Sequence, residues 1–181
     1  NHMGYVTDYA DVRQSLPAQV LRDRYAGVVS WFSGFMPEAR RKDVSQWLQA
    51  RLAEGMPLAV VGDWGMVPDR ALARSLGLAS PTPDVSGALR GGSMHSMMGQ
   101  ETTPQTPGRQ SELVQLRPEM ARQSQALVEA RDAKDKAFVG GAITPWGGFI
   151  LDPHVLYEIP GTDDARWVVD PFAFLQQALR L

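Results

Sequence analysis

The sequence predicts one α/β domain, in which helices flank a parallel β-sheet that continues into an antiparallel extension. Three observations predict this fold. The first part of the chain alternates strand-like and helix-like segments, a long stretch rich in Pro, Ser, Thr, Gly and Gln interrupts the middle, and short strand-like segments follow. The length of 181 residues and the hydrophobic fraction of 44% suffice for a single core.

The first part is predicted to form strand, helix, strand and helix in turn. Residues 27–32 and 57–62 are short apolar runs rich in β-branched side chains, which are typical of buried strands. Residues 37–54 predict a helix because apolar side chains recur at spacings of three and four, and residues 69–76 predict a shorter one. A right-handed crossover would place the two strands side by side and parallel. The glycines that follow the helices, where helices commonly end, are Gly55 and Gly77.

The middle of the chain, residues 79–111, is predicted to be a long loop or insertion. The segments after it are short and separated by turn residues, so we expect them to form the antiparallel extension. These strand-like segments are residues 113–116, 125–130, 137–140 and 149–151, with a hairpin turn at 132–135.

The C-terminal part is predicted to return to α/β structure. Residues 166–169 read as a strand, Asp170 is placed to cap a helix, and Pro171 would occupy the first position of that helix. The apolar face of that helix would be formed by Phe172, Leu175, Ala178 and Leu179.

Composition excludes several classes of function. The net charge of −2 gives no positive field for nucleic acid, and no window approaches the roughly 20 apolar residues of a membrane span. The absence of Cys removes disulfides, thiolate metal sites and cysteine nucleophiles. The three histidines stand in no supporting motif, and no glycine-rich phosphate loop follows a strand. We therefore expect no catalytic residue, metal or cofactor in this chain.

Candidate ligand-binding residues follow three strand-like runs, each with a Trp beside small or polar residues. If the loops converge, they would form a cleft in which aromatic rings stack on a sugar or another ring-bearing ligand. The alternative is that each Trp fills a gap between helix and sheet, and that Asp63 caps the following turn. The candidates are Ser30, Trp31, Ser33, Asp63, Trp64, Thr144 and Trp146.

Three stretches resemble the middle region of the PelA family, which are periplasmic proteins of Pel exopolysaccharide biosynthesis. They are residues 25–32, residues 142–153 with Thr-Pro-Trp-Gly-Gly, and residues 167–175 with Trp-Val-Val-Asp-Pro-Phe. The resemblance implies a Rossmann-like or flavodoxin-like domain between a glycoside hydrolase domain and a polysaccharide deacetylase domain. The acidic residues of that hydrolase and the metal-binding Asp and His residues of that deacetylase have no counterparts here.

The resemblance therefore implies a fragment of a larger periplasmic protein, serving as a structural or glycan-binding module without catalysis of its own. Its partners would be the flanking catalytic domains and an amino-sugar polysaccharide. Two other interpretations stay open. One is a flavodoxin-like or amidotransferase-like domain that binds a flavin, a nucleotide or another small molecule, although the missing Cys argues against amidotransfer. The other is a scaffold with no ligand.

Overall fold

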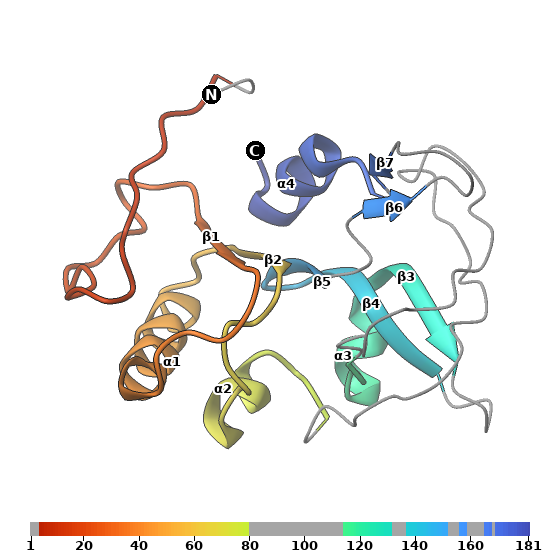
Figure 1. Cartoon of the computed structure of the whole chain (residues 1–181), viewed down its shortest axis with the longest axis horizontal. Coiled ribbons are helices and arrows are strands. Elements are labelled where there is room, and N and C mark those ends of the chain that lie inside the picture. Colours follow the sequence, from red (N-terminus) through yellow and green to blue (C-terminus); the bar gives the residue numbers. More distant parts are fainter. Residues whose placement is uncertain (1–3, 80–113, 132–136, 152–155, 159–164, 168) are drawn as a thin grey trace.

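The computed structural model describes residues 4–79, 114–131, 137–151, 156–158, 165–167 and 169–181 (Figure 1). Nearly all of the predicted loop at 79–111 and the predicted hairpin turn at 132–135 lie outside these residues. Among the described helices, none is long and apolar enough to cross a bilayer.

A five-stranded mixed sheet forms the centre of the molecule, in the order β1-β2-β5-β4-β3. Strands β1, β2 and β5 are parallel neighbours, β4 is antiparallel to β5, and β3 is antiparallel to β4. The predicted α/β fold with a parallel core and an antiparallel extension is thus confirmed. The strands are β1 (Val28–Phe32), β2 (Leu58–Gly62), β3 (Gln125–Arg131), β4 (Ala137–Thr144) and β5 (Gly147–Leu151).

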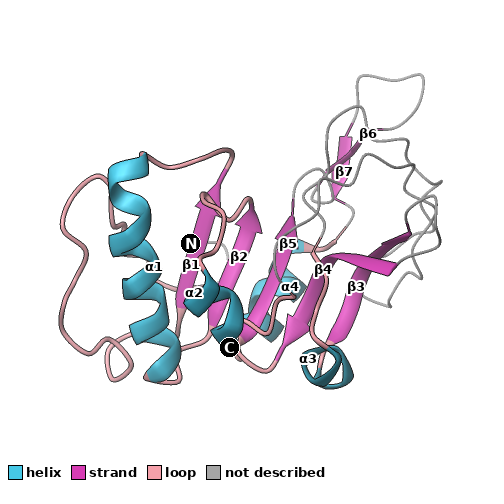
Figure 2. Cartoon of the chain, turned by 90° about the horizontal axis from the view of Figure 1, so that it is seen from below, coloured by secondary structure: helices cyan, strands magenta, loops and turns pink. Residues whose placement is uncertain are grey.

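Helices cover both faces of the sheet (Figures 1 and 2). The helices α1 and α2 lie on one face and α4 lies on the other, while α3 lies near the end of the antiparallel extension. The helices are α1 (Glu38–Ala53), α2 (Arg70–Ser75), α3 (Pro118–Gln123) and α4 (Pro171–Leu179).

The alternation of side chains along β2 divides the core into two clusters. Leu58 and Val60 face α1 and α2, where Leu48 and Leu72 pack against them. Ala59 points the other way and packs under α4. The α4 residues in this second cluster are Phe174, Ala178 and Leu179.

Capping residues set the helix boundaries, and the cap at Asp69 was not predicted from the sequence. The Asp69 side chain accepts hydrogen bonds from the backbone N–H groups of Ala71 and Leu72, which lack partners within the helix. Asp170 caps α4 in the same way, and Pro171 is its first residue. Gly55 follows the end of α1 with a φ of +72°.

The structure differs from the sequence prediction in three strands. Strand β5 was assigned to the antiparallel extension, but it is a central strand parallel to β2. Strand β7 (Ala165–Trp167) does not join the main sheet, because it pairs with the nearby β6 (Leu156–Glu158) in a separate two-stranded sheet. Of the predicted strand at 113–116, the described residues 114–116 form no strand, since Val114 and Leu116 make only isolated bridges.

Strand β1 was predicted to be buried, and it is instead an edge strand with one open face. Its side chains alternate between half-buried and exposed, with Val29 and Trp31 exposed. Register pairs these two residues with Ala59 and Val61 of β2, on the face that carries α4. Helix α4 packs on β2, β4 and β5, so the part of this face formed by β1 stays open.

Candidate functional site

The seven candidate residues lie at opposite ends of the sheet. Strands β1, β2 and β5 end at the carboxyl edge, where Trp31, Ser33 and Asp63 lie. Trp146 lies at the amino edge, because β4 runs antiparallel and turns into β5 through Pro145 and Trp146. The backbone N–H of Leu58, the first residue of β2, donates to the Trp146 carbonyl at 2.9 Å. The three loops therefore do not converge, and the condition for a single cleft is not met.

Trp64 is a core residue. Its side chain is 5% exposed, and its ring centroid lies 5.7 Å from that of Phe149 on β5. It belongs to the cluster packed under α1 and α2. Trp64 therefore fits the alternative in which a Trp fills a gap between helix and sheet.

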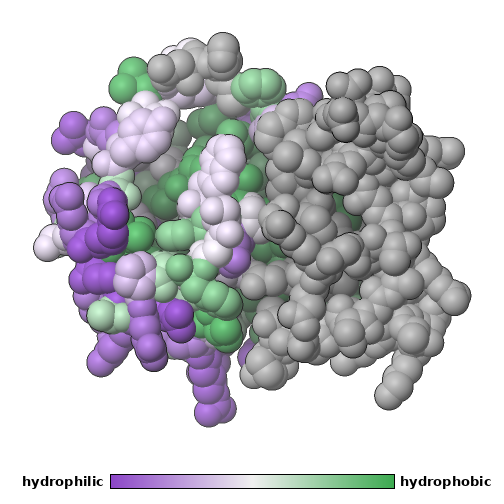
Figure 3. Space-filling model, viewed as in Figure 1, coloured by the Kyte–Doolittle hydropathy of each residue, from purple (hydrophilic) through white to green (hydrophobic). Residues whose placement is uncertain are grey.

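Trp31 is the exposed aromatic residue of the carboxyl edge. Its side chain is 69% exposed, and Val29 lies two residues earlier on the same open strand face. Figure 3 shows apolar surface in the region of β1, next to the polar surface of the N-terminal segment. An indole in this position can receive a flat ligand without displacing a helix.

Asp63 directly follows Gly62, which lies next to the Trp31 side chain. Atom Cδ1 of Trp31 is 3.8 Å from the position that a Cβ on Gly62, the residue before Asp63, would occupy. The Asp63 Oδ1 atom accepts a 2.8 Å hydrogen bond from the backbone N–H of Gly65, which fixes the turn. Its Oδ2 atom receives no hydrogen bond from the described part of the chain.

The two serines do not lie together with Trp31 and Asp63 on one face of the sheet. Ser30 pairs in register with Val60, so the strand alternation directs it toward α1 and away from the Trp31 face. Ser33 follows the end of β1 and is exposed. At the carboxyl edge, the candidates that remain are therefore Trp31 and Asp63, with Ser33 exposed just after β1.

At the amino edge, the ring of Trp146 is held in a fixed orientation. Its Nε1 donates to the Leu76 carbonyl at 3.0 Å, and the indole lies 6.2 Å from the Phe149 ring with 16° between their planes. The next residue, Gly147, has a φ of +135°, and a Cβ there would lie 2.1 Å from the Leu58 carbonyl oxygen. Only glycine permits this close approach between the hairpin and β2.

Thr144 precedes the same hairpin and is buried. Register and alternation place it on the face of Ala142, which belongs to the cluster under α1 and α2. Its Oγ1 atom has no hydrogen-bond partner among the described residues.

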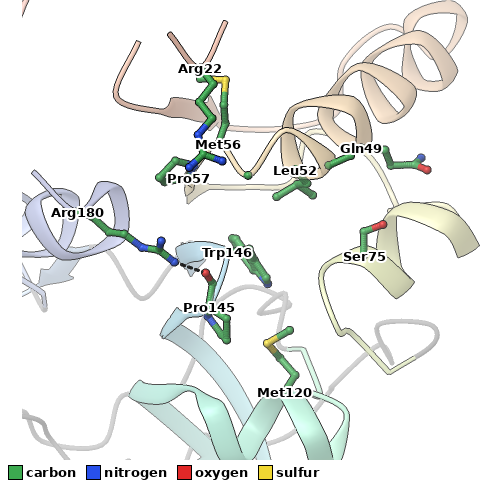
Figure 4. Close-up of a pocket in the computed structure, with 12 residues that line it drawn as sticks. Arg22, Gln49, Leu52, Met56, Pro57, Ser75, Met120, Pro145, Trp146 and Arg180 are labelled. Atoms are coloured by element: carbon green, nitrogen blue, oxygen red, sulfur yellow. Dashed lines mark hydrogen bonds between the residues drawn. The ribbon is translucent and has the colours of Figure 1, made fainter. Parts of the chain in front are cut away.

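Trp146 also lines a pocket of about 530 Å³ that the sequence did not predict (Figure 4). Apolar lining side chains come from α1, the α1–β2 turn and α3, and two arginines contribute charge. Arg22 and Arg180 stand in no motif and come from distant parts of the chain, so no local pattern could have identified them. The pocket lining includes Leu52, Met56, Pro57, Met120, Pro145 and the two arginines.

The described residues contain no cluster of three or more His, Asp or Glu side chains that could hold a metal ion. All three histidines, at positions 2, 95 and 154, lie outside these residues. The chemistry that the described sites offer is therefore stacking, hydrogen bonding and charge pairing.

No family model matches the chain, and no curated protein or solved structure matches it significantly.

Proposed function

We propose that this chain is a non-catalytic sugar-binding module of a larger periplasmic protein that makes or modifies an exopolysaccharide. The observation that carries the proposal is that an exposed Trp31 and Asp63 lie at the same edge of the sheet, with Trp31 next to Gly62, the residue before Asp63. In open α/β sheets, ligands bind at this edge.

The pair has the two properties that a sugar ring requires. A pyranose has an apolar face of C–H groups that stacks on an indole, and Trp31 offers its indole on a strand face that α4 leaves open. A carboxylate accepts hydrogen bonds from hydroxyl groups, and Asp63 has an oxygen that no described residue uses.

The charge of Asp63 favours an amino sugar over a neutral one. Removal of an acetyl group from an N-acetylated sugar leaves an ammonium group, which forms a stronger, charge-assisted hydrogen bond with a carboxylate. A partially deacetylated amino-sugar polymer is also the ligand that the resemblance to the PelA family implies. The same resemblance supports the flanking catalytic domains of a longer chain as partners.

Isothermal titration calorimetry with partially deacetylated N-acetylgalactosamine oligomers tests the proposal. We expect Trp31→Ala to weaken binding by roughly five- to tenfold, since aromatic stacking contributes about 1 kcal/mol. Asp63→Asn is the sharper variant, because Asn keeps the oxygen that accepts from Gly65 and loses only the charge. It should weaken binding of deacetylated oligomers and leave binding of fully acetylated oligomers unchanged.

Tyr9→Ala is the matched control, because Tyr9 is an exposed aromatic residue far from β1 in sequence. Its oligomer affinity should equal that of the unchanged protein. Equal affinity in Trp31→Ala would refute the sugar site. Binding of a flavin or an adenine nucleotide, with no binding of any oligomer, would favour the small-molecule alternative.

A further inference from the structure

The pocket at the amino edge is assembled from segments that are far apart in the chain. Arg22 precedes β1, Leu52 belongs to α1, Met120 belongs to α3, and Arg180 ends α4. Trp146 lies between these side chains in Figure 4. The pocket is separated from Trp31 and Asp63 by the length of the parallel strands, so the two sites can be tested independently.

The pocket has an aromatic wall at Trp146 and a mixed lining of apolar side chains with the polar Gln49 and Ser75. The hydrogen bond to the Leu76 carbonyl and the stacking on Phe149 hold the indole of Trp146. Met56, which is buried, and Met120 contribute thioether side chains, which adapt to aromatic rings. A planar ring beside Trp146 would therefore contact an indole whose orientation is already fixed.

The margin of the pocket is positively charged. Arg22 and Arg180 line it, and no Asp or Glu does. Neither arginine forms an ion pair within the described residues. Glu54 does not neutralise Arg22, because its carboxylate pairs with Arg51 at 2.6 Å.

Each guanidinium is positioned by one backbone carbonyl and keeps other donors free for a ligand. Arg22 Nη1 donates to the Glu54 carbonyl at 2.7 Å, and Arg180 Nη2 donates to the Pro145 carbonyl. A guanidinium has five N–H donors, so these bonds leave most of them available. Gly55 makes room for Arg22, since a Cβ at residue 55 would lie 2.3 Å from Nη1.

From these observations we infer that the pocket is a second binding site, specific for an aromatic ring that carries a phosphate or carboxylate group. The ring lies beside Trp146, and the anionic group lies between the guanidiniums of Arg22 and Arg180, whose paired N–H donors match the oxygen atoms of a carboxylate or a phosphate. This site goes beyond the proposed sugar site and does not depend on it.

Calorimetric titration with phenyl phosphate tests the inference, with benzoate, inorganic phosphate and phenol as comparators. Phenyl phosphate or benzoate should bind more tightly than phosphate or phenol, because only the first two carry both the ring and the charge. The relative affinities of phenyl phosphate and benzoate distinguish the two anionic groups. Arg22→Gln and Arg180→Gln should each weaken binding by roughly tenfold or more, since each removes a charge-assisted hydrogen bond.

Arg24→Gln is the matched control, because Arg24 lies two residues from Arg22 and its guanidinium is over the Tyr25 ring instead of in the pocket. It should leave the affinity unchanged, as should Trp31→Ala. Arg180→Lys keeps the charge and loses the planar fork, so an intermediate affinity is expected. Thermal unfolding of each variant separates loss of the site from loss of the fold.

Two outcomes would overturn the inference. One is the absence of binding of both phenyl phosphate and benzoate at concentrations up to about 10 mM, the range of a weak small-ligand site. The other is binding that stays unchanged in the folded Arg22→Gln, Arg180→Gln double variant.

Discussion

The hydroxyl of Ser45, on the buried side of α1, donates a 2.6 Å hydrogen bond to the carboxylate of Asp69, the capping residue of α2. The same carboxylate accepts from the backbone N–H groups of Ala71 and Leu72. One side chain thus both starts α2 and joins it to α1, on the face of the sheet that holds the larger part of the core.

We expect Asp69→Ala to lower the free energy of unfolding by about 1–2 kcal/mol, because it removes a helix cap and leaves the buried Ser45 hydroxyl without its acceptor. Urea unfolding at neutral pH measures the change. Asp69→Asn keeps an oxygen in the capping position, so its loss should be smaller. An equal loss in both variants would show that the carbonyl oxygen of Asn cannot replace the carboxylate as a cap.

The same contact predicts a dependence on pH. The hydrogen bond from Ser45, followed by the one from the Leu72 backbone, lowers the pKa of Asp69 below its ordinary value of 3.8. Because the pKa is lowered in the folded state, the carboxylate stabilises the fold fully above the pKa of the unfolded chain, and this contribution is lost as pH falls through the folded pKa. The stability difference between the unchanged protein and Asp69→Asn should therefore shrink as pH falls below the ordinary value of 3.8. A difference that is constant with pH would contradict this role of the charge.

Gly147→Ala should destabilise the protein by about 3 kcal/mol, since the variant adds both backbone strain and a clash with β2. The added Cβ would lie 2.1 Å from the Leu58 carbonyl oxygen, at a φ of +135°. Gly34→Ala is the control, because a Cβ at residue 34 meets nothing within 4 Å. Denaturant unfolding of the two variants compares them directly, and similar losses would disprove the close approach.

The tryptophans at positions 31 and 64 should respond in opposite ways to truncation. Trp64→Ala should cost about 3–5 kcal/mol because it opens a cavity in the core, whereas Trp31→Ala should change stability by about 0.5 kcal/mol or less. Thermal unfolding monitored by circular dichroism distinguishes the two. A large loss in Trp31→Ala would assign it a structural role and weaken the case for a sugar platform.

Local sequence predicted α1, α2 and α4, because their signals are contained within a few residues, but it did not predict the short α3. Asp170 caps the helix that it was expected to cap, and the apolar spacing that includes Val44 and Leu48 predicted the buried side of α1. The parallel pairing of β1 and β2 was also predicted, since two strands joined by a helix usually lie parallel and are connected by a right-handed crossover.

Strand direction was the property that local sequence did not reveal. Residues 144–148 look like other strand ends, but whether they lie at the carboxyl or the amino edge depends on how β4 pairs. The pairing places Trp146 away from Trp31 and brings it to Arg22 and Arg180, which are 124 and 34 residues away from it in the chain. A site built from such distant residues carries no spacing pattern.

The open side of β1 has a practical consequence for handling the protein. Val28 donates its backbone N–H to the Pro57 carbonyl, so alternation turns the N–H and C=O groups of Val29 and Trp31 outward, where no described strand pairs with them. The strand has no Pro or charged side chain, which are the residues that usually prevent sheets from joining edge to edge. Concentrated solutions therefore favour growth of the sheet by a strand from another polypeptide, and a lysine in place of Val29 is the simplest change that would keep the molecules apart.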